Sequence, residues 1–522
     1  MKHSIIKSSR IISLFTMLSR SLGMVRDILM AGFFGTGVHM SAFVLAFTIP
    51  NLFRRLFGEG SLSSAFIPVF VETKKREGEN QAWLLARHTI TLLATFLAGV
   101  VAVGILGITI AMRSSHLSEM TSTVLPLLRI MLPYTFFICL AALAMAILNS
   151  FRRFAVPAAM PCLLNIIWIS TILFIAPRST GAPESRIHAV AWAILIAGSI
   201  QLLGQLPSLL RCGYKPGFAF DVHDPKVRQV FTLMAPAAIA MAVTQINVLI
   251  DRLLAAWISD WAPAALFFSE RLVYLPLGIF ATAMGTVLLP TLSEHAIEKD
   301  SDGLRATLTL ATKKVLSLLI PAAVGLFVLA APIIQLLFEW KNFDAASTAQ
   351  TAIALKFYAP GLIVFGMSKM LVPVFYAHQD MRTPVRLSVV TVGINLVLNI
   401  IFVLTWPTHI KHAGLAFGTV LAGTFYVSTL TFSLNKRKLA PSWIIIFKTS
   451  WRCIPAAVIM GITAPLIHTT LSTLLTAKEL PVKIVQITAL PVSIAIAAAI
   501  YFTLTFVSFP SFLKRENISR ES

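Results

Sequence analysis

Charged residues are scarce in this chain of 522 residues. They make up 12% of it, whereas soluble domains carry roughly 25%. Acidic residues are the scarcest, with 22 Asp and Glu against 43 Lys and Arg. Hydrophobic residues reach 57%, and the mean hydropathy is +0.81. This balance excludes a soluble globular protein and predicts an all-α integral membrane protein with little mass outside the bilayer.

The sequence also lacks the motifs of catalysis and metal binding. Its four cysteines form no CxxC pair, and its eleven histidines form no HxxxH or HExxH pair. It contains no Walker A motif and no GxSxG. We therefore expect no catalytic residues, no cofactor, no structural metal and no disulfide framework, and the chain is predicted not to be an enzyme.

The excess of positive charge, formally +21, has two explanations. It could bind nucleic acid, or it could reflect the enrichment of Lys and Arg in cytoplasmic loops of membrane proteins. The second explanation is favoured, because the basic residues cluster between apolar segments. The clusters are Lys74-Lys75-Arg76, Arg152-Arg153, Lys313-Lys314 and Lys436-Arg437-Lys438. No nucleic-acid partner is expected, and anionic lipid is a secondary contact for these clusters.

About fourteen apolar segments are long enough to cross a bilayer, which takes about 20 residues. They lie at 11–34, 41–71, 84–111, 123–149, 155–177, 187–210, 229–257, 262–293, 311–338, 349–377, 384–406, 411–434, 445–470 and 481–508. We number the links between consecutive segments in chain order, so that the second link joins the second and third segments. If the N-terminus is cytoplasmic, the even-numbered links are cytoplasmic as well. Most Lys and Arg residues outside the segments then fall in these links and in the two termini. The asymmetry predicts that both termini are cytoplasmic.

Weak internal similarity predicts a repeat. Asp27-Ile28-Leu29 resembles Asp251-Arg252-Leu253, and Phe66-Ile67-Pro68 resembles Leu288-Leu289-Pro290 at almost the same offset. Helices 1–6 would correspond to helices 7–12, in two six-helix lobes related by a parallel repeat. The predicted domains are residues 1–215, residues 216–438 and an additional pair of C-terminal helices in residues 439–522.

The first predicted helix carries charge inside an apolar segment. A charge at mid-bilayer costs roughly 2.5–3.5 kcal/mol. At about 100° per residue, Arg20, Arg26 and Asp27 share one face of this helix. That face would line a hydrated cavity, although an ion pair of Arg26 with Asp27 that holds the bundle together is an alternative.

The second predicted helix is interrupted by Pro50, Gly58 and Gly60 and carries Arg54, Arg55 and Glu59 between these residues. Interrupted helices at membrane depth occur beside protein or a water-filled cavity. Arg55 and Glu59 are spaced to pair, and arginines that reach toward the membrane surface are the alternative to a cavity site.

The second half offers related charges in Asp251-Arg252 and Glu270-Arg271. Guanidinium groups are permanently charged and bind phosphate through two parallel hydrogen bonds. The predicted site for an anion, a phosphate or pyrophosphate, therefore consists of Arg20, Arg26, Arg54, Arg55 and Arg271. The supporting charges of the cavity are Asp27, Glu59, Asp251, Arg252 and Glu270.

At this level of detail the sequence resembles a known family. The segment from Pro50-Asn51-Leu52-Phe53-Arg54-Arg55 to Gly58-Glu59-Gly60 resembles the signature of the MurJ (MviN) family of lipid II flippases. Segments around Arg20 and Arg26 and around Glu270 and Arg271 are similar to the first and eighth helices of that family. The family belongs to the multidrug/oligosaccharidyl-lipid/polysaccharide exporter superfamily.

The resemblance implies a flippase in the bacterial cytoplasmic membrane that moves lipid II, the peptidoglycan precursor, to the outer leaflet by alternating access. The family's essential arginines correspond to Arg20, Arg26, Arg54 and Arg271, and its last two helices form a groove for the undecaprenyl tail. Lipid II, membrane lipids and cell-wall synthesis proteins are the implied partners. Ser41 stands where the family often has an acid. Sodium sites of relatives have only weak counterparts here in Asp251, Asn395 and Asn399.

Three alternatives remain at this stage. The cargo could be another polyprenyl-pyrophosphate-linked oligosaccharide, or the chain could be a drug/cation antiporter of the same fold. A cation antiporter would need an excess of carboxylates, which this sequence lacks. A membrane-embedded glycosyltransferase would need a carboxylate with a metal or lipid-phosphate partner outside the membrane.

Overall fold

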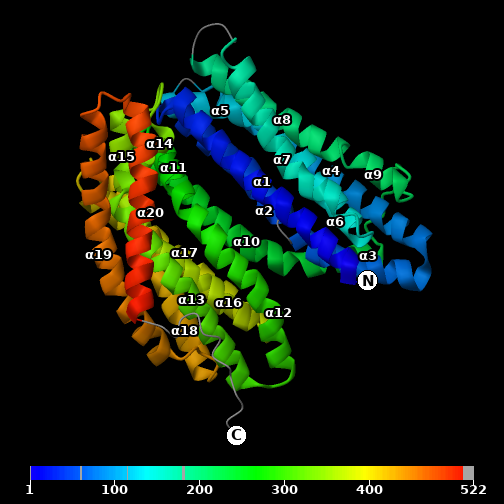
Figure 1. Cartoon of the computed structure of the whole chain (residues 1–522). Helices are drawn as coiled ribbons and strands as arrows, with labels where there is room; N and C mark the ends of the chain where they lie inside the picture. The colour runs from blue at the N-terminus through cyan, green and yellow to red at the C-terminus, as the bar shows by residue number, and fades with distance from the viewer. Residues whose placement is uncertain (1, 59–60, 115, 179–182, 509–522) are drawn as a thin grey trace. The chain divides into compact units, whose positions relative to one another are not determined.

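The computed structural model describes residues 2–58, 61–114, 116–178 and 183–508 of the chain. Within these residues every regular element is a helix, as Figure 1 shows. The chain divides into two compact units, one of residues 1–264 with Trp340–Phe343 and one of residues 265–339 with 344–522. Each unit is described separately below.

The first unit is built from helices that cover the first half of the sequence. They are α1 (Lys2–Phe34), α2 (Val38–Gly58), α3 (Ser61–Glu77), α4 (Glu79–Ala111), α5 (Glu119–Met131), α6 (Tyr134–Ser150), α7 (Ala155–Ser170), η1 (Thr171–Ile175), α8 (Pro183–Leu203), α9 (Leu206–Arg211) and α10 (Pro225–Ile258).

The second unit begins inside α11 and contains the remaining helices. They are α11 (Ala262–Pro276), η2 (Leu277–Thr282), α12 (Ala283–Ile297), α13 (Ser301–Val328), α14 (Ala330–Phe338), α15 (Ala345–Tyr358), α16 (Gly361–Ala377), α17 (Arg382–Thr405), α18 (Lys411–Lys436), α19 (Trp443–Thr476) and α20 (Val482–Ser508). The last two helices pack along each other, as the orange and red ribbons of Figure 1 show.

Eleven helices in the described residues are long and apolar enough to cross a membrane, or twelve if the bent pair α15 and α16 is one span. These twelve coincide with the third to fourteenth predicted segments. The first two predicted segments are also helical, in α1, α2 and α3, but they do not reach the same apolar character. Their arginines lower the mean hydropathy of these helices. The protein is thus an all-helical, multi-pass membrane protein.

The fourth and tenth predicted helices, which the predicted repeat makes equivalent, are both interrupted, and the eighth is irregular; in the second, residues 59 and 60 lie outside the described residues. In the eighth, α11 ends at Pro276 and passes through the π-helical turn η2 into α12. In the fourth, α5 and α6 meet at Pro133, and in the tenth, α15 and α16 meet at Pro360 with a bend of 43°. Proline cannot continue the helical hydrogen-bond ladder, which explains the breaks at these prolines. They agree with the repeat, which stays a prediction.

The helix α10 packs against α2, α3 and α4, within the first unit. The repeat assigns this helix to the second lobe because its sequence resembles that of the first helix. Sequence similarity and packing therefore group α10 differently. The reason is that a repeat records local sequence, whereas packing depends on which apolar faces meet.

Links that are predicted to share one side of the membrane contact each other in the structure. In the first unit, Lys226 pairs with Glu77, and His88 lies 2.8 Å from an Asp224 oxygen. In the second unit, an ion pair of 2.6 Å between Arg437 and Asp380 joins two further even-numbered links. These contacts agree with the predicted alternation of links between the two membrane sides.

A short segment, Trp340–Phe343, packs on the C-terminal end of α1 and belongs to the first unit. The Trp340 indole N–H donates to the Ile28 carbonyl at 3.1 Å, and its ring meets Phe33 edge-on. The Asn342 side chain donates to the Phe33 carbonyl at 2.6 Å. Gly32 lies directly under the indole, where an added methyl group would overlap it. The contact therefore requires a residue without a side chain at position 32.

Replacing Gly32 by alanine is expected to destabilise the protein by about 1–3 kcal/mol, the usual cost of overpacking. The indole cannot move away without losing its hydrogen bond to Ile28. Thermal unfolding of the purified protein in detergent should show a lower Tm. Gly37→Ala is the matched control, because an added methyl group there meets nothing within 4 Å. Equal Tm values for the two variants would contradict this packing.

A pH dependence is expected from Asp380, which follows α16. Partial burial opposes the charged form, but hydrogen bonds from Thr383 and the charge of Arg437 outweigh it and lower the Asp380 pKa to about 2. The unfolded carboxyl titrates near about 4. The stabilisation is therefore complete above about pH 4 and is lost as the pH falls toward 2. The Tm difference between wild type and Asp380→Asn should be largest at pH 7 and shrink below pH 4. A difference that stays constant from pH 7 to pH 3 would contradict this assignment.

Candidate functional site

Arg26 on α1 is the centre of a polar cluster inside the first unit. Its Nε and Nη2 donate to one oxygen of Asp27 at 2.9 and 2.7 Å, and Asp27 is 4% exposed. Its Nη1 donates to the Asn165 amide oxygen on α7 at 3.0 Å. The guanidinium also stacks 4.5 Å from the centre of the Trp168 ring. Asn165 in turn donates to the Ser19 carbonyl at 3.0 Å, so the cluster joins α1 to α7.

This geometry gives Arg26 a structural part as well as a charge. The ion pair with Asp27 lies within one helix, and the bond between helices is made through Asn165. A buried charge needs such partners because it has lost its water. Each of the three nitrogen atoms of the Arg26 guanidinium makes one hydrogen bond, and these bonds use three of its five N–H groups.

Arg54 and Arg55 on α2 have different partners. Arg54 Nε donates to the Asn51 amide oxygen at 2.9 Å, one turn earlier on the same helix. Arg55 Nη1 approaches the buried Gln245 of α10 at 3.4 Å, and its buried Nε has no hydrogen-bond partner among the described residues. Arg54 and Arg55 therefore point to different surroundings, because consecutive residues of a helix lie about 100° apart around its axis.

Arg20 on α1 differs from the other arginines of this unit. It is exposed, and within the part of the chain that the structure describes it has no ion pair or hydrogen bond. Its guanidinium is thus available for an anion without the loss of an internal contact.

Tyr134, the first residue of α6, brings a polar group into the interior of the first unit. Its ring centre lies 6.3 Å from that of Phe47 on α2. Tyr134 is fully buried, and its hydroxyl has no partner among the described residues. The fourth predicted helix thus presents a buried hydroxyl beside the second helix.

The predicted supporting charges on α10 lie in the same unit. Asp251 accepts a hydrogen bond from Asn247 at 3.3 Å, one turn away. Arg252 is buried and donates to the Pro263 carbonyl at 3.1 Å, which ties the end of α10 to the start of α11. Arg252 therefore has a clear structural function.

In the second unit, Arg271 and Glu270 lie on α11, little more than one turn before the break at Pro276. The Arg271 guanidinium stacks 4.5 Å from the centre of the Phe267 ring on the same helix. On α17, Asn399 donates to Asn395 at 3.0 Å, and Asn395 donates to Thr419 of α18 at 3.4 Å. The two asparagines named as weak sodium candidates are thus buried and serve helix packing.

Glu59 lies outside the described residues, so its predicted pairing with Arg55 stays a prediction. In the described residues no three His, Cys, Asp or Glu side chains gather in a way that could hold a metal ion. The predicted sodium ligands Asp251, Asn395 and Asn399 belong to different units, and this candidate also stays a prediction.

Several residues of the site carry no signal in the sequence. They are Asn165, Trp168, Gln245 and Tyr134. They lie far from the arginines in sequence, and polar or aromatic residues in apolar helices are common. Only the packing of α7, α10 and α6 against α1 and α2 brings them to the charges.

Comparisons with known proteins identify the family. The model of the lipid II flippase MurJ family matches residues 30–485. The lipid II flippase MurJ of Burkholderia cenocepacia is 34% identical over 448 residues, which cover 84% of this chain and 85% of the relative. The chain belongs to the MurJ lipid II flippase family. It is accordingly a transporter and not an enzyme, as the sequence predicted.

Further comparisons agree. A probable lipid II flippase MurJ of Vibrio cholerae is 34% identical over 446 residues, 83% of each chain. A solved lipid II flippase MurJ in an inward closed conformation has the same fold, with a TM-score of 0.78 at 24% identity, over 96% of this chain and 98% of the other. An inward-facing multidrug resistance MATE family transporter of the MOP superfamily gives 0.68 at 16% identity, over 83% and 96%. The predicted superfamily fold is therefore confirmed.

The contact of Asn165 with Arg26 leads to a stability prediction. Asn165→Ala removes the acceptor of Arg26 and the donor to Ser19, so we expect a loss of about 1–3 kcal/mol and a lower Tm in detergent. Asn80→Ala is the control, since Asn80 is exposed at the start of α4 and has no side-chain hydrogen bond among the described residues. Unchanged unfolding of Asn165→Ala would show that the cluster does not hold α1 and α7 together.

Proposed function

We propose that this chain moves lipid II from the cytoplasmic to the outer leaflet by alternating access, with arginines as the ligands of its pyrophosphate. The family membership is the observation that carries the proposal. The arginines add a physical reason, because Arg20, Arg26, Arg54 and Arg55 place four permanent positive charges on two helices of a membrane protein.

These arginines differ in their contacts and therefore in what each one would contribute to phosphate binding. Arg20 is exposed and unengaged among the described residues, so it can bind a phosphate oxygen directly. Arg26 would contribute its charge and the two N–H groups that its bonds to Asp27 and Asn165 leave unused, from a guanidinium whose position these bonds fix. Arg54, bonded to Asn51 on its own helix, and Arg55, at the long distance of 3.4 Å from Gln245, would supply the second helix of the site. Arg271 would be the contribution of the second lobe.

The remaining parts of the proposal extend this mechanism. The protein would have fourteen spans, with α1 as the first and α2 with α3 as the second, and both termini in the cytoplasm of a bacterium. The lobes would be residues 1–215 and 216–438. The helices α19 and α20, in residues 439–522, expose many apolar side chains and would hold the undecaprenyl tail. Cell-wall synthesis proteins would take up the delivered precursor.

The arginines distinguish this function from the antiporter alternative. A site for organic cations would need more carboxylates than guanidinium groups, and the described charges of α1 and α2 are Arg20, Arg26, Arg54 and Arg55 against Asp27 alone, apart from the basic residues before Ile11. A different polyprenyl-pyrophosphate cargo would use the same arginines, and binding measurements with defined lipids separate the two cargoes.

Arg20→Ala and Arg271→Ala are each expected to abolish rescue of a bacterial strain depleted of its own lipid II flippase. Lysine at either position should rescue poorly, because an ammonium group cannot form the two parallel hydrogen bonds of a guanidinium. Binding of lipid II to the purified variants, measured by native mass spectrometry, should weaken at least about tenfold.

The control is Arg228→Ala, which removes an exposed charge at the start of α10 outside the proposed site. It should support growth and bind lipid II as the wild type does, and undecaprenyl phosphate should bind more weakly than lipid II. Normal growth with Arg20→Ala and Arg271→Ala at normal protein levels would refute the proposed site.

A further inference from the structure

A second cationic site lies at one end of the first unit, separate from the arginines of the proposed transport site. It is a cavity of about 320 Å³ where the start of α1, the turn between α6 and α7, and α9 meet. The side chains around it are Ile11, Arg152, Arg153, Phe154, Ala155, Val156, Ser208 and Arg211. Three of them are arginines and none is acidic, so the lining has an uncompensated positive charge.

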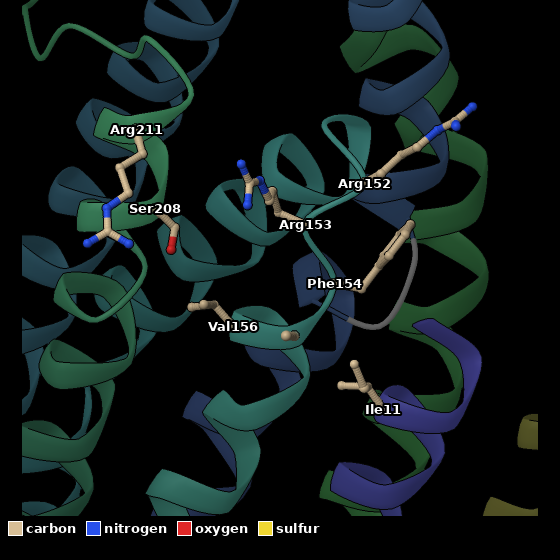
Figure 2. A pocket seen from close by; sticks show the side chains of 8 residues that line it. Ile11, Arg152, Arg153, Phe154, Val156, Ser208 and Arg211 are labelled. Atoms are coloured by element: carbon tan, nitrogen blue, oxygen red, sulfur yellow. The ribbon is translucent and has the colours of Figure 1, made fainter. Parts of the chain in front are cut away.

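Two of these arginines face one hollow. Figure 2 shows the guanidinium groups of Arg153 and Arg211 on either side of the Ser208 hydroxyl, whereas Arg152 extends away from them. Within the described residues neither Arg153 nor Arg211 has an ion pair or a side-chain hydrogen bond. Both arginines are exposed to solvent, so water screens their mutual repulsion, and their guanidinium N–H groups are available to bind an anion.

The backbone holds Arg153 in this position. Arg152 has a left-handed conformation with φ of 59°, which glycine usually adopts at the end of a helix. The Arg153 N–H then donates to the Leu148 carbonyl at 2.9 Å and closes the end of α6. A left-handed arginine costs roughly 1–2 kcal/mol. The turn is thus defined by hydrogen bonds, and it directs Arg153 toward α9.

The other side of the cavity is apolar and suits a lipid better than a free anion. Ile11, Phe154 and Val156 line it. Farther along α1, Leu14, Met17 and Leu18 are 65%, 70% and 45% exposed, so apolar side chains extend along the helix beyond the cavity. A phosphate between the arginines would leave acyl chains free to follow this apolar surface.

We propose that this cavity binds the phosphodiester headgroup of an anionic phospholipid, with Arg153 and Arg211 on the phosphate and Ser208 as an additional donor. The three segments that form it, the start of the chain and the fourth and sixth links, are all predicted to be cytoplasmic. The ligand would therefore come from the cytoplasmic leaflet. Such a lipid would secure the ends of α1, α7 and α9, and the proposal does not depend on the transported substrate.

The test uses the full-length protein in detergent and measures lipid binding by native mass spectrometry. The probes are phosphatidylglycerol, phosphatidylcholine with the same acyl chains, and inorganic phosphate. Wild type should bind phosphatidylglycerol in preference to phosphatidylcholine. The double variant Arg153→Ala/Arg211→Ala should bind phosphatidylglycerol roughly 25-fold more weakly, about fivefold for each basic residue.

Matched variants make the result specific. Lys215→Ala/Arg228→Ala removes two exposed positive charges near the same links and should bind phosphatidylglycerol as the wild type does. Arg153→Lys/Arg211→Lys keeps the charge but loses the guanidinium geometry, and we expect partial loss. Lipid II binding should be unchanged in Arg153→Ala/Arg211→Ala, which separates this site from the transport site.

Three outcomes would overturn the proposal. One is equal loss of phosphatidylglycerol binding in the two alanine double variants, which would indicate a diffuse effect of charge. Another is equal binding of both lipids by the wild type. The third is displacement of phosphatidylglycerol by inorganic phosphate at a similar concentration, which would indicate a site for a free anion. A normal Tm of each variant establishes that it is folded.

Discussion

The physical constraint on which this structure depends is the permanent positive charge of guanidinium groups in apolar helices. An arginine cannot lose its charge by releasing a proton, so each one needs water, an anion or a set of acceptors. Arg26 has the most complete set, in Asp27, Asn165 and the Trp168 ring. Arg252 uses a backbone carbonyl, and Arg20 remains open in the described part of the chain. The same residue type therefore serves packing at one position and is available for a ligand at another.

The interrupted helices are related to this constraint. In a regular helix the backbone N–H and C=O groups form hydrogen bonds with one another, so none of them is left to bind a ligand or a polar side chain. The breaks at Pro133 and Pro360, at positions that the predicted repeat makes equivalent, and the π-helical turn after Pro276 interrupt that regularity. Arg54 and Arg55 lie about a turn after Pro50 in α2, and Arg271 lies little more than one turn before Pro276. Local irregularity and charge thus occur together in both halves of the sequence, which is a common property of transporters.

The structure also shows how the basic links can have more than one function. Their bias toward one side predicts the topology, but individual members have specific contacts. Arg437 binds Asp380, Lys226 binds Glu77, and Arg153 and Arg211 face the cavity at the start of α1. Charge asymmetry in the sequence is a sum over many residues, and it says nothing about which of them are paired. Pairing depends on the packing of helices that are distant in sequence.

The sequence by itself determined the membrane class, the positions of the helices and the family, because apolar runs and the motif at Pro50–Arg55 are local properties of the chain. It also identified the unusual charges of α1, α2 and α11. Only the tertiary structure decided which arginines have internal partners. Asn165 is 139 residues from Arg26, and Gln245 is 190 residues from Arg55. It likewise placed α10 with the first unit and brought Arg153 and Arg211 to the same cavity. Contacts of this kind result from the packing of helix faces, and periodicity within one helix cannot specify the neighbour of a face.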